Sequence, residues 1–188
     1  MKVKLILIAF VFIFLSTEYT GNFSIISVAN AQEQNPRKTK RVGSMSEKVA
    51  KKLGEAQELI EAEQIQEGIE ILNEILSSKR LSDYERAQVY YFLAYTAYLQ
   101  EDYKKAINFY KRVLNEDAVP EGLLSAARFT IAQLWFQLED WDQAISAVDD
   151  LLATEESPRP DLYILKGSAL YQLKKYKELI PVIQSAID

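Results

Sequence analysis

The chain of 188 residues contains neither cysteine nor histidine. It therefore cannot form a disulfide, and it lacks the residues needed for Ser-His or Cys-His catalysis and for a zinc site built on Cys or His. Without a thiol, a lipoprotein anchor is excluded as well. Glycine is scarce, with six residues, and none of them belongs to a phosphate-cradling loop. We expect neither a cofactor nor a bound metal.

Positive charge is in the minority, since 22 lysines and arginines stand against 27 aspartates and glutamates and give a net charge of −5. An acidic chain is a poor binder of nucleic acid. Paired carboxylates occur at Glu116-Asp117, Asp149-Asp150 and Glu155-Glu156, and such pairs can perform acid–base catalysis. They fall at expected helix ends and in loops, where solvated charge is the ordinary state. We therefore predict that the protein is not an enzyme.

Residues 1–31 have the features of a signal peptide. Two lysines within the first four residues precede an unbroken apolar run at 5–15, which is too short to span a bilayer comfortably. Ala29-Asn30-Ala31 supplies the small-x-small pattern that signal peptidase cleaves. We predict cleavage after this pattern and an exported chain without a membrane span. The alternative is an uncleaved membrane anchor, which the polar stretch at 16–22 disfavours.

The next segment, residues 32–43, carries four basic residues and one acidic residue. Its low hydrophobicity and high charge predict a disordered basic tail. The simplest interpretation is a solvated linker. The alternative is an arm that contacts a membrane surface or a partner.

The rest of the chain repeats one pattern four times. A bulky residue opens the pattern at Ile65, Tyr103, Trp141 and Tyr176, at spacings of 38, 38 and 35 residues. Positions 3, 7 and 10 residues later complete one helix face. A small residue nine positions before the bulky one, and another three after it, allow two antiparallel helices to approach closely. These pairs are Ala56 and Gly68, Ala94 and Ala106, and Ala132 and Ala144, while the fourth copy has Gly167 and Leu179.

Capping signals place several helix starts. Ser44–Glu47 and Ser82–Glu85 both match the capping box, in which a hydroxyl and a carboxylate satisfy each other's backbone amides. Pro160 suits the first turn of a helix. Pro181 lacks an amide donor and would cost about 3 kcal/mol in mid-helix. We therefore predict a late start or a kink in the last helix.

These features resemble the tetratricopeptide repeat family, whose unit is a helix-turn-helix of 34 residues. The resemblance covers residues 46–188 and is most specific at Tyr90, Leu93, Ala94, Ala97, Tyr103, Ala106, Tyr110 and Val113. It implies an all-α, right-handed superhelical solenoid. We assign a repeat domain to 44–188, with units near 49–82, 87–118, 125–156 and 160–188. A plain helical bundle is the alternative fold.

In such a solenoid the first helix of each unit lines the concave side. Residues of the first helices that are not needed for packing should then form a partner-binding groove rich in aromatic rings and amides. The predicted groove residues are Gln88, Tyr91, Tyr95, Tyr98, Phe129, Gln133, Phe136, Ile164 and Tyr171. We interpret Tyr90, Tyr103, Tyr110, Trp135 and Trp141 as packing residues instead.

The sequence leaves two alternatives for what occupies this groove. One is a segment of a partner protein, and the other is the protein itself, as a homodimer or through its own chain. No polar capping helix follows residue 188, so Ile180, Ile183 and Ile187 are expected to be partly exposed. This favours dimerisation or a shortened form of a longer repeat protein.

A narrower resemblance is to exported tetratricopeptide repeat proteins that accompany bacterial TonB energy-transduction systems. It rests on the order of signal, tail and repeats, and on residues 160–187. It implies a periplasmic, non-catalytic interaction scaffold with TonB-system components as partners.

Overall fold

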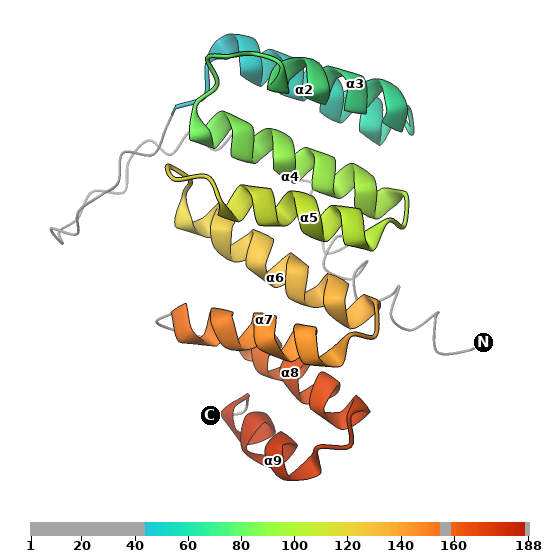
Figure 1. Cartoon of the computed structure of the whole chain (residues 1–188), viewed down its shortest axis with the longest axis vertical. Helices are drawn as coiled ribbons and strands as arrows, with labels where there is room; N and C mark the ends of the chain where they lie inside the picture. The colour runs from blue at the N-terminus through green and yellow to red at the C-terminus, as the bar shows by residue number, and fades with distance from the viewer. Residues whose placement is uncertain (1–43, 155–158, 187–188) are drawn as a thin grey trace, which may run out of the picture. The chain divides into compact units, whose positions relative to one another are not determined.

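A computed structural model describes residues 44–154 and 159–186, which belong to one compact unit, Thr39–Asp188. The predicted signal peptide and basic tail, the pair Glu155-Glu156, and Ile187 lie outside the described residues. Within these ranges the chain forms eight α-helices and no strand (Figure 1). They are α2 (Glu47–Glu61), α3 (Ile65–Leu76), α4 (Asp83–Leu99), α5 (Tyr103–Leu114), α6 (Glu121–Gln137), α7 (Trp141–Thr154), α8 (Pro160–Gln172) and α9 (Tyr176–Ser185).

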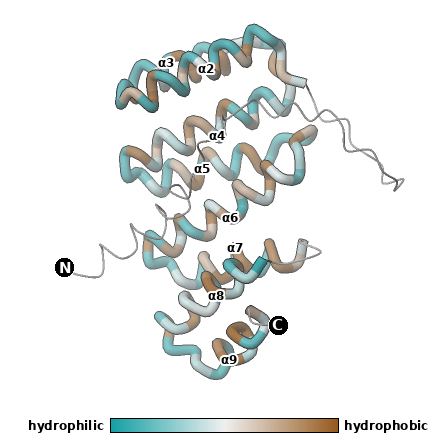
Figure 2. Tube along the Cα trace, turned by 180° about the vertical axis from the view of Figure 1, so that it is seen from behind, coloured by the Kyte–Doolittle hydropathy of each residue, from teal (hydrophilic) through white to brown (hydrophobic). Residues whose placement is uncertain are grey.

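The helices form four successive pairs, α2–α3, α4–α5, α6–α7 and α8–α9, and each pair packs tightly on itself. Neighbouring pairs join because α3 packs on α4, α5 on α6, and α7 on α8. Figure 1 shows this stacking from one end of the repeat domain to the other, and Figure 2 shows the same stack from behind. The four second helices begin at the four bulky residues of the repeat, so the spacing of 38, 38 and 35 residues is a spacing of helices. The fold is an all-α solenoid of helix pairs, as predicted.

The turn inside each pair has the same backbone geometry. Its left-handed residue is Glu63, Glu101, Glu139 or Lys174, with φ between 58° and 62°. The amide after it donates to the carbonyl five residues earlier, at 2.8–3.0 Å in all four turns. This is the Schellman closure of a helix C-terminus. The repeat is therefore present in the backbone as well as in the side chains.

The predicted small positions are the closest helix contacts. Ala56, Ala94, Ala106, Ala132 and Ala144 are all completely buried. A Cβ added to Gly68 would lie 2.7 Å from Ile60 Cγ1 and 3.1 Å from the carbonyl oxygen of Ala56. In the last pair Leu179 is large, but a Cβ on Gly167 would already lie 3.2 Å from its Cδ1. The glycine thus makes room for the leucine on the facing helix.

The two predicted capping boxes have different outcomes. Ser82 and Glu85 form the full reciprocal box at the start of α4. The Ser44–Glu47 box is wrong, because α2 begins at Glu47 with Ser46 as its N-cap, and Ser46 makes no side-chain cap bond. Its hydroxyl donates instead to Glu85 Oε1, at 2.7 Å. The Ser46 side chain therefore bonds to a residue of α4 instead of capping its own helix.

Glu85 consequently holds the starts of α2 and α4 together. Its side chain is buried and accepts the amide and hydroxyl of Ser46 at 2.9 and 2.7 Å, and those of Ser82 at 2.8 and 3.1 Å. Burial alone would raise the pKa of this carboxyl, but the four hydrogen bonds outweigh it, so the pKa of Glu85 lies below its ordinary value. The group is a charged clamp between two repeat units.

The last pair departs from the others at both of its prolines. Pro160 is the first residue of α8, where its missing amide costs nothing, as predicted. The last helix, α9, begins at Tyr176, the same repeat position at which α3, α5 and α7 begin, so its start is not later than theirs. Pro181 lies inside the helix rather than at its edge, so the carbonyl of Lys177 lacks its usual amide partner. Among the described helices, none is both long enough and apolar enough to cross a membrane.

Candidate partner-binding surface

Helix α4 carries the central residues of the predicted groove. Tyr91, Tyr95 and Tyr98 lie four and three residues apart, which places them along one face of the helix. All three are half-buried, and the neighbouring Leu99 is exposed. The opposite positions of α4 are buried alanines and Leu93. From Val89 to Leu99 the helix is therefore largely apolar on all sides, and one side is tyrosine rather than aliphatic.

Ring contacts fix two of these tyrosines. The Tyr91 ring meets Tyr110 edge to face with centroids 5.2 Å apart, and the Tyr98 ring lies 5.9 Å from that of Tyr103. Such pairs restrain ring orientation before any partner arrives. A partner would meet rigid rings and lose little side-chain entropy on binding.

The hydroxyls of this face stay protonated. Burial raises the pKa of Tyr91, burial and then the carboxylate of Glu61 raise that of Tyr95, and burial and then Tyr103 and Tyr95 raise that of Tyr98. The surface therefore offers neutral hydrogen-bond donors and no phenolate at physiological pH.

A cleft of about 630 Å³ lies beside Tyr95. Tyr95 and Leu99 form its wall on α4, and the end of α2, the following turn and the start of α3 supply Ile60, Glu61, Glu63 and Ile65. Apolar side chains together with two carboxylates favour a partner segment that combines apolar and basic residues.

The other predicted groove residues are not part of this cleft. Gln88 donates a hydrogen bond to the Tyr84 hydroxyl at 2.9 Å. The Arg159 guanidinium covers the Phe129 ring, with 4.7 Å between its central carbon and the ring centroid. Gln133 is half-buried on α6. Ile164 and Tyr171 on α8 are exposed, by 48% and 60%.

The predicted role of Phe136 as a groove residue is wrong. It is buried, and its ring packs edge-on against Trp141 with centroids 4.8 Å apart, so it is not available to a partner. The same contact recurs across the turn as Tyr98–Tyr103 and Tyr171–Tyr176. The five-residue spacing of these pairs was visible in the sequence, and in the first unit Ile60 and Ile65 stand at the same positions. Sequence reasoning assigned one ring of each pair to the groove and missed the pair.

Two family comparisons match this repeat. Residues 74–151 match the family described as anaphase-promoting complex, cyclosome, subunit 3, and residues 129–188 match a family described as tetratricopeptide repeat. Residues 129–188 therefore resemble tetratricopeptide repeats in sequence. Proteins built from such repeats generally mediate protein–protein interactions, and stacked repeats provide extended binding surfaces.

Solved structures agree with the tetratricopeptide repeat fold. A crystal structure of MamA superposes with a TM-score of 0.60 at 16% identity, covering 74% of this chain and 76% of that one. A second, described as MamA AMB-1, gives 0.58 at 16% identity, covering 73% and 70%. At this identity the likeness concerns the fold alone. No curated protein matched the chain.

Proposed function

We propose that this chain is a non-catalytic protein-interaction scaffold whose partner binds at the cleft beside Tyr95. The observation that carries the proposal is the cleft itself, where an exposed leucine, a half-buried tyrosine and two carboxylates surround open space. Tyrosine is one of the residue types enriched at interface hot spots. The partner segment is expected to place an apolar side chain against Ile65 and Leu99 and a basic one near Glu61.

The proposal further locates the protein in the periplasm, as an accessory of a TonB-dependent uptake system. Export is supported by the apolar run at 5–15 and the cleavage pattern at 29–31. The TonB assignment is supported only by the sequence resemblance at 160–187 and the order of segments.

A photo-crosslinking residue at position 95 tests both parts in cells. We expect it to capture another protein in the periplasmic fraction, and Leu99→Lys in the same chain to reduce the captured amount at least fivefold, because a lysine there adds charge to the apolar wall. The matched control places the crosslinker at Lys104, an exposed residue of α5 outside the cleft. Capture that is equal from both positions, or unaffected by Leu99→Lys, would contradict binding at the cleft. Recovery only in the cytosol would contradict export.

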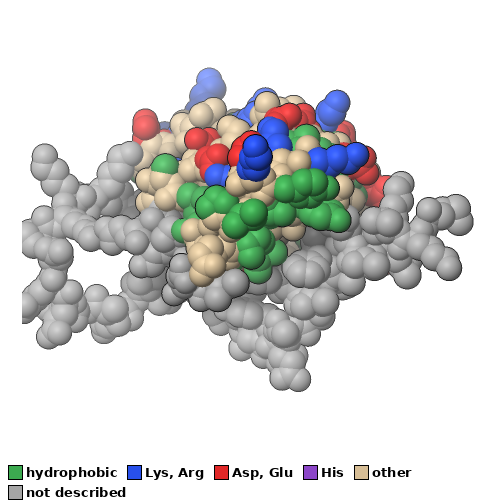
Figure 3. Space-filling model, turned by 90° about the horizontal axis from the view of Figure 1, so that it is seen from below, with side chains coloured by type: hydrophobic (Ala, Val, Ile, Leu, Met, Phe, Trp, Pro, Cys, Tyr) green, Lys and Arg blue, Asp and Glu red, His purple; other side chains and the backbone are tan. Residues whose placement is uncertain are grey.

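A second candidate function is self-association through α9. This helix has no buried residue, and Ile180 and Ile183 are exposed by 72% and 41%. In the three other pairs the residues equivalent to Ile183 are Leu72, Tyr110 and Val148, which are at most 4% exposed. They are buried in clusters with residues of the next helix, α4, α6 or α8. Figure 3 shows apolar side chains gathered at the α9 end of the repeat domain.

Sedimentation velocity over a hundredfold range of concentration tests this candidate. If a second copy covers α9, the wild-type chain forms a dimer, and Ile180→Lys raises its dissociation constant at least tenfold by placing a charge in the apolar contact. Asn108→Lys, at an exposed site of α5, serves as the control and is expected to leave the dimer unchanged. A wild-type chain that stays monomeric throughout would eliminate the dimer.

A further inference from the structure

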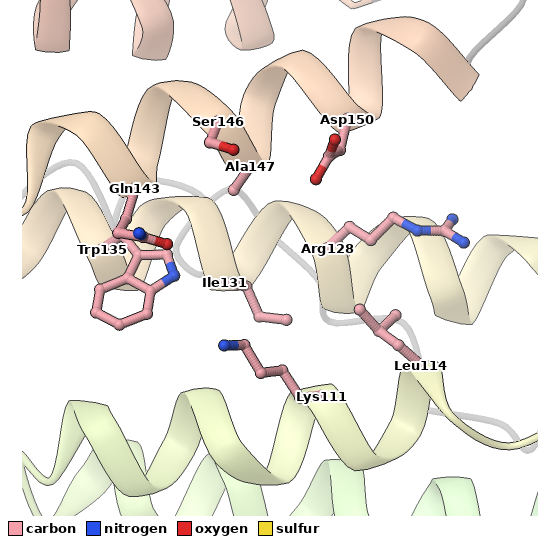
Figure 4. A pocket seen from close by; sticks show the side chains of 9 residues that line it. All are labelled: Lys111, Leu114, Arg128, Ile131, Trp135, Gln143, Ser146, Ala147 and Asp150. Carbon is pink, nitrogen blue, oxygen red and sulfur yellow. The ribbon is translucent and has the colours of Figure 1, made fainter.

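A second cavity lies on a different part of the fold, between α5, α6 and α7 (Figure 4). Its volume is about 270 Å³. Ile131 and Trp135 of α6 and Ala147 of α7 form an apolar floor, while Lys111, Arg128 and Asp150 stand around the opening. It shares no lining residue with the cleft at Tyr95.

The repeat explains why this space is open. Tyr90 and Phe109 stand 38 residues before Arg128 and Ala147, at the same places in the preceding unit. There both rings pack against the cores on either side of α4, and the Arg112 guanidinium covers them at 5.4 and 5.7 Å from their centroids. In the third unit an arginine and an alanine take these two positions.

Arg128 does not fill the space that Tyr90 fills. Its guanidinium donates to Glu121 Oε1 at 2.7 Å, and Figure 4 shows it extending along α6 away from Trp135. Ala147 is too small to replace the Phe109 ring. Trp135 has the place of Ala97 and adds bulk at one end, but the cavity remains.

We propose that this cavity binds one aromatic side chain of a partner peptide. The preceding unit shows what fits, since aromatic rings of the chain itself occupy the equivalent space. The volume is below that of most small-molecule sites, which favours a single side chain over a larger ligand. The Trp135 indole gives the incoming ring an aromatic wall.

The charged residues around the opening indicate which residue of the partner peptide lies next to the aromatic one. Lys111 Nζ lies 5.6 Å from the Trp135 ring centroid, and no carboxylate within the described ranges pairs with it. Arg128 is already paired with Glu121. Asp150 stands near Arg128, at the end of the cavity away from Trp135, as Figure 4 shows, and would repel a carboxylate there. The partner peptide therefore carries an acidic residue beside its aromatic one, and that residue pairs with Lys111.

The test is an NMR titration of the full chain with the peptide acetyl-Gly-Glu-Phe-Gly-amide. The two tryptophans of the chain give separate indole N–H signals, and only Trp135 lines the cavity. We expect the Trp135 signal to shift saturably while that of Trp141 stays in place. Replacing phenylalanine in the peptide by alanine should abolish the shift.

Variants that refill the cavity provide the decisive comparison. Arg128→Tyr and, separately, Ala147→Phe restore the residues of the preceding unit, and each should weaken peptide binding at least tenfold while raising the melting temperature. Lys104→Gln, elsewhere on α5, is the matched control and should bind as the wild type does. Exchange of the peptide glutamate for glutamine should weaken binding threefold or more in the wild type and have no effect in Lys111→Gln.

Several outcomes would overturn the proposal. One is an unshifted Trp135 signal at 10 mM peptide, and another is undiminished binding by the folded Ala147→Phe protein. Binding of N-acetylphenylalaninamide, which has no carboxylate, at least as tight as that of the peptide would assign the cavity to a small molecule instead. None of these results bears on the cleft at Tyr95, so the two proposals stand or fall separately.

Discussion

Glu85→Ala is expected to lower the free energy of unfolding by about 3 kcal/mol at pH 7. The substitution removes the acceptor of four hydrogen bonds, from the amides and hydroxyls of Ser46 and Ser82. Donors left without partners in a buried site cost about 1–3 kcal/mol each, although Ser46 is exposed enough to regain water. Urea unfolding followed by circular dichroism measures the change, and α2 should be the first helix to lose protection in hydrogen exchange.

The same carboxylate predicts how stability depends on pH. Its pKa is lower in the folded chain than the reference value of 4.5, so the folded state favours the charged form. A group of this kind contributes stability at pH values above its unfolded pKa, and the contribution is lost as pH falls through the folded pKa. The difference in stability between the wild type and Glu85→Gln should therefore be constant from pH 7 to about 5.5 and shrink below 4.5.

Glu70→Ala is the control for both measurements. Glu70 is an exposed residue of α3 and is expected to change stability by less than about 0.5 kcal/mol at every pH. If Glu85→Ala were no more destabilising than Glu70→Ala, the clamp between α2 and α4 would have no energetic importance. Equal pH dependence of wild type and Glu85→Gln would place the acid sensitivity elsewhere.

The solenoid could be predicted because its signals are local and repeated. Helix spacing, the small pairs and the Ser82–Glu85 box all lie within about 40 residues, and four copies reinforce each other. The left-handed turns were not predicted, since glutamate and lysine occupy positions that usually favour glycine. The turn is held by the close packing of the helices on either side, which overrides the local preference.

The candidate site was predicted less well for a physical reason. Whether a half-apolar ring faces a partner or the next helix depends on the rotation of two elements relative to each other, which periodicity within one helix does not determine. Tyr98 and Phe136 stand at the same repeat position and both contact the bulky residue that opens the next helix, yet Tyr98 is half-buried and Phe136 is buried. The cavity at Trp135 was missed because it arises from what Arg128 and Ala147 fail to fill. A comparison of position 90 with 128 and of 109 with 147 would have shown it in the sequence.

Two glycine substitutions are expected to have opposite signs, although both replace a helical glycine with alanine. Gly54→Ala should stabilise the chain by about 1 kcal/mol, because alanine is the better helix former and a Cβ there meets nothing within 4 Å. Gly68→Ala should destabilise it by about 2 kcal/mol, because overpacking of 1–3 kcal/mol exceeds the propensity gain. The added Cβ would lie 2.7 Å from Ile60 Cγ1, close to the stem of a buried branched side chain, and 3.1 Å from the Ala56 carbonyl oxygen.

The added Cβ of Gly68→Ala would meet the Ala56 backbone as well as Ile60, so we expect α3 to move away from α2, and this gives the prediction a second readout. Ile60 and Ile65 line the Tyr95 cleft, so a displaced α3 should also weaken capture from position 95. Gly54→Ala leaves that cleft intact and serves as the matched control, with both stabilities measured by urea unfolding. A Gly68→Ala protein as stable as Gly54→Ala would mean that α2 and α3 do not depend on close approach at this position. Ala56 and Gly68 would then be small residues that are not needed for the close approach of α2 and α3.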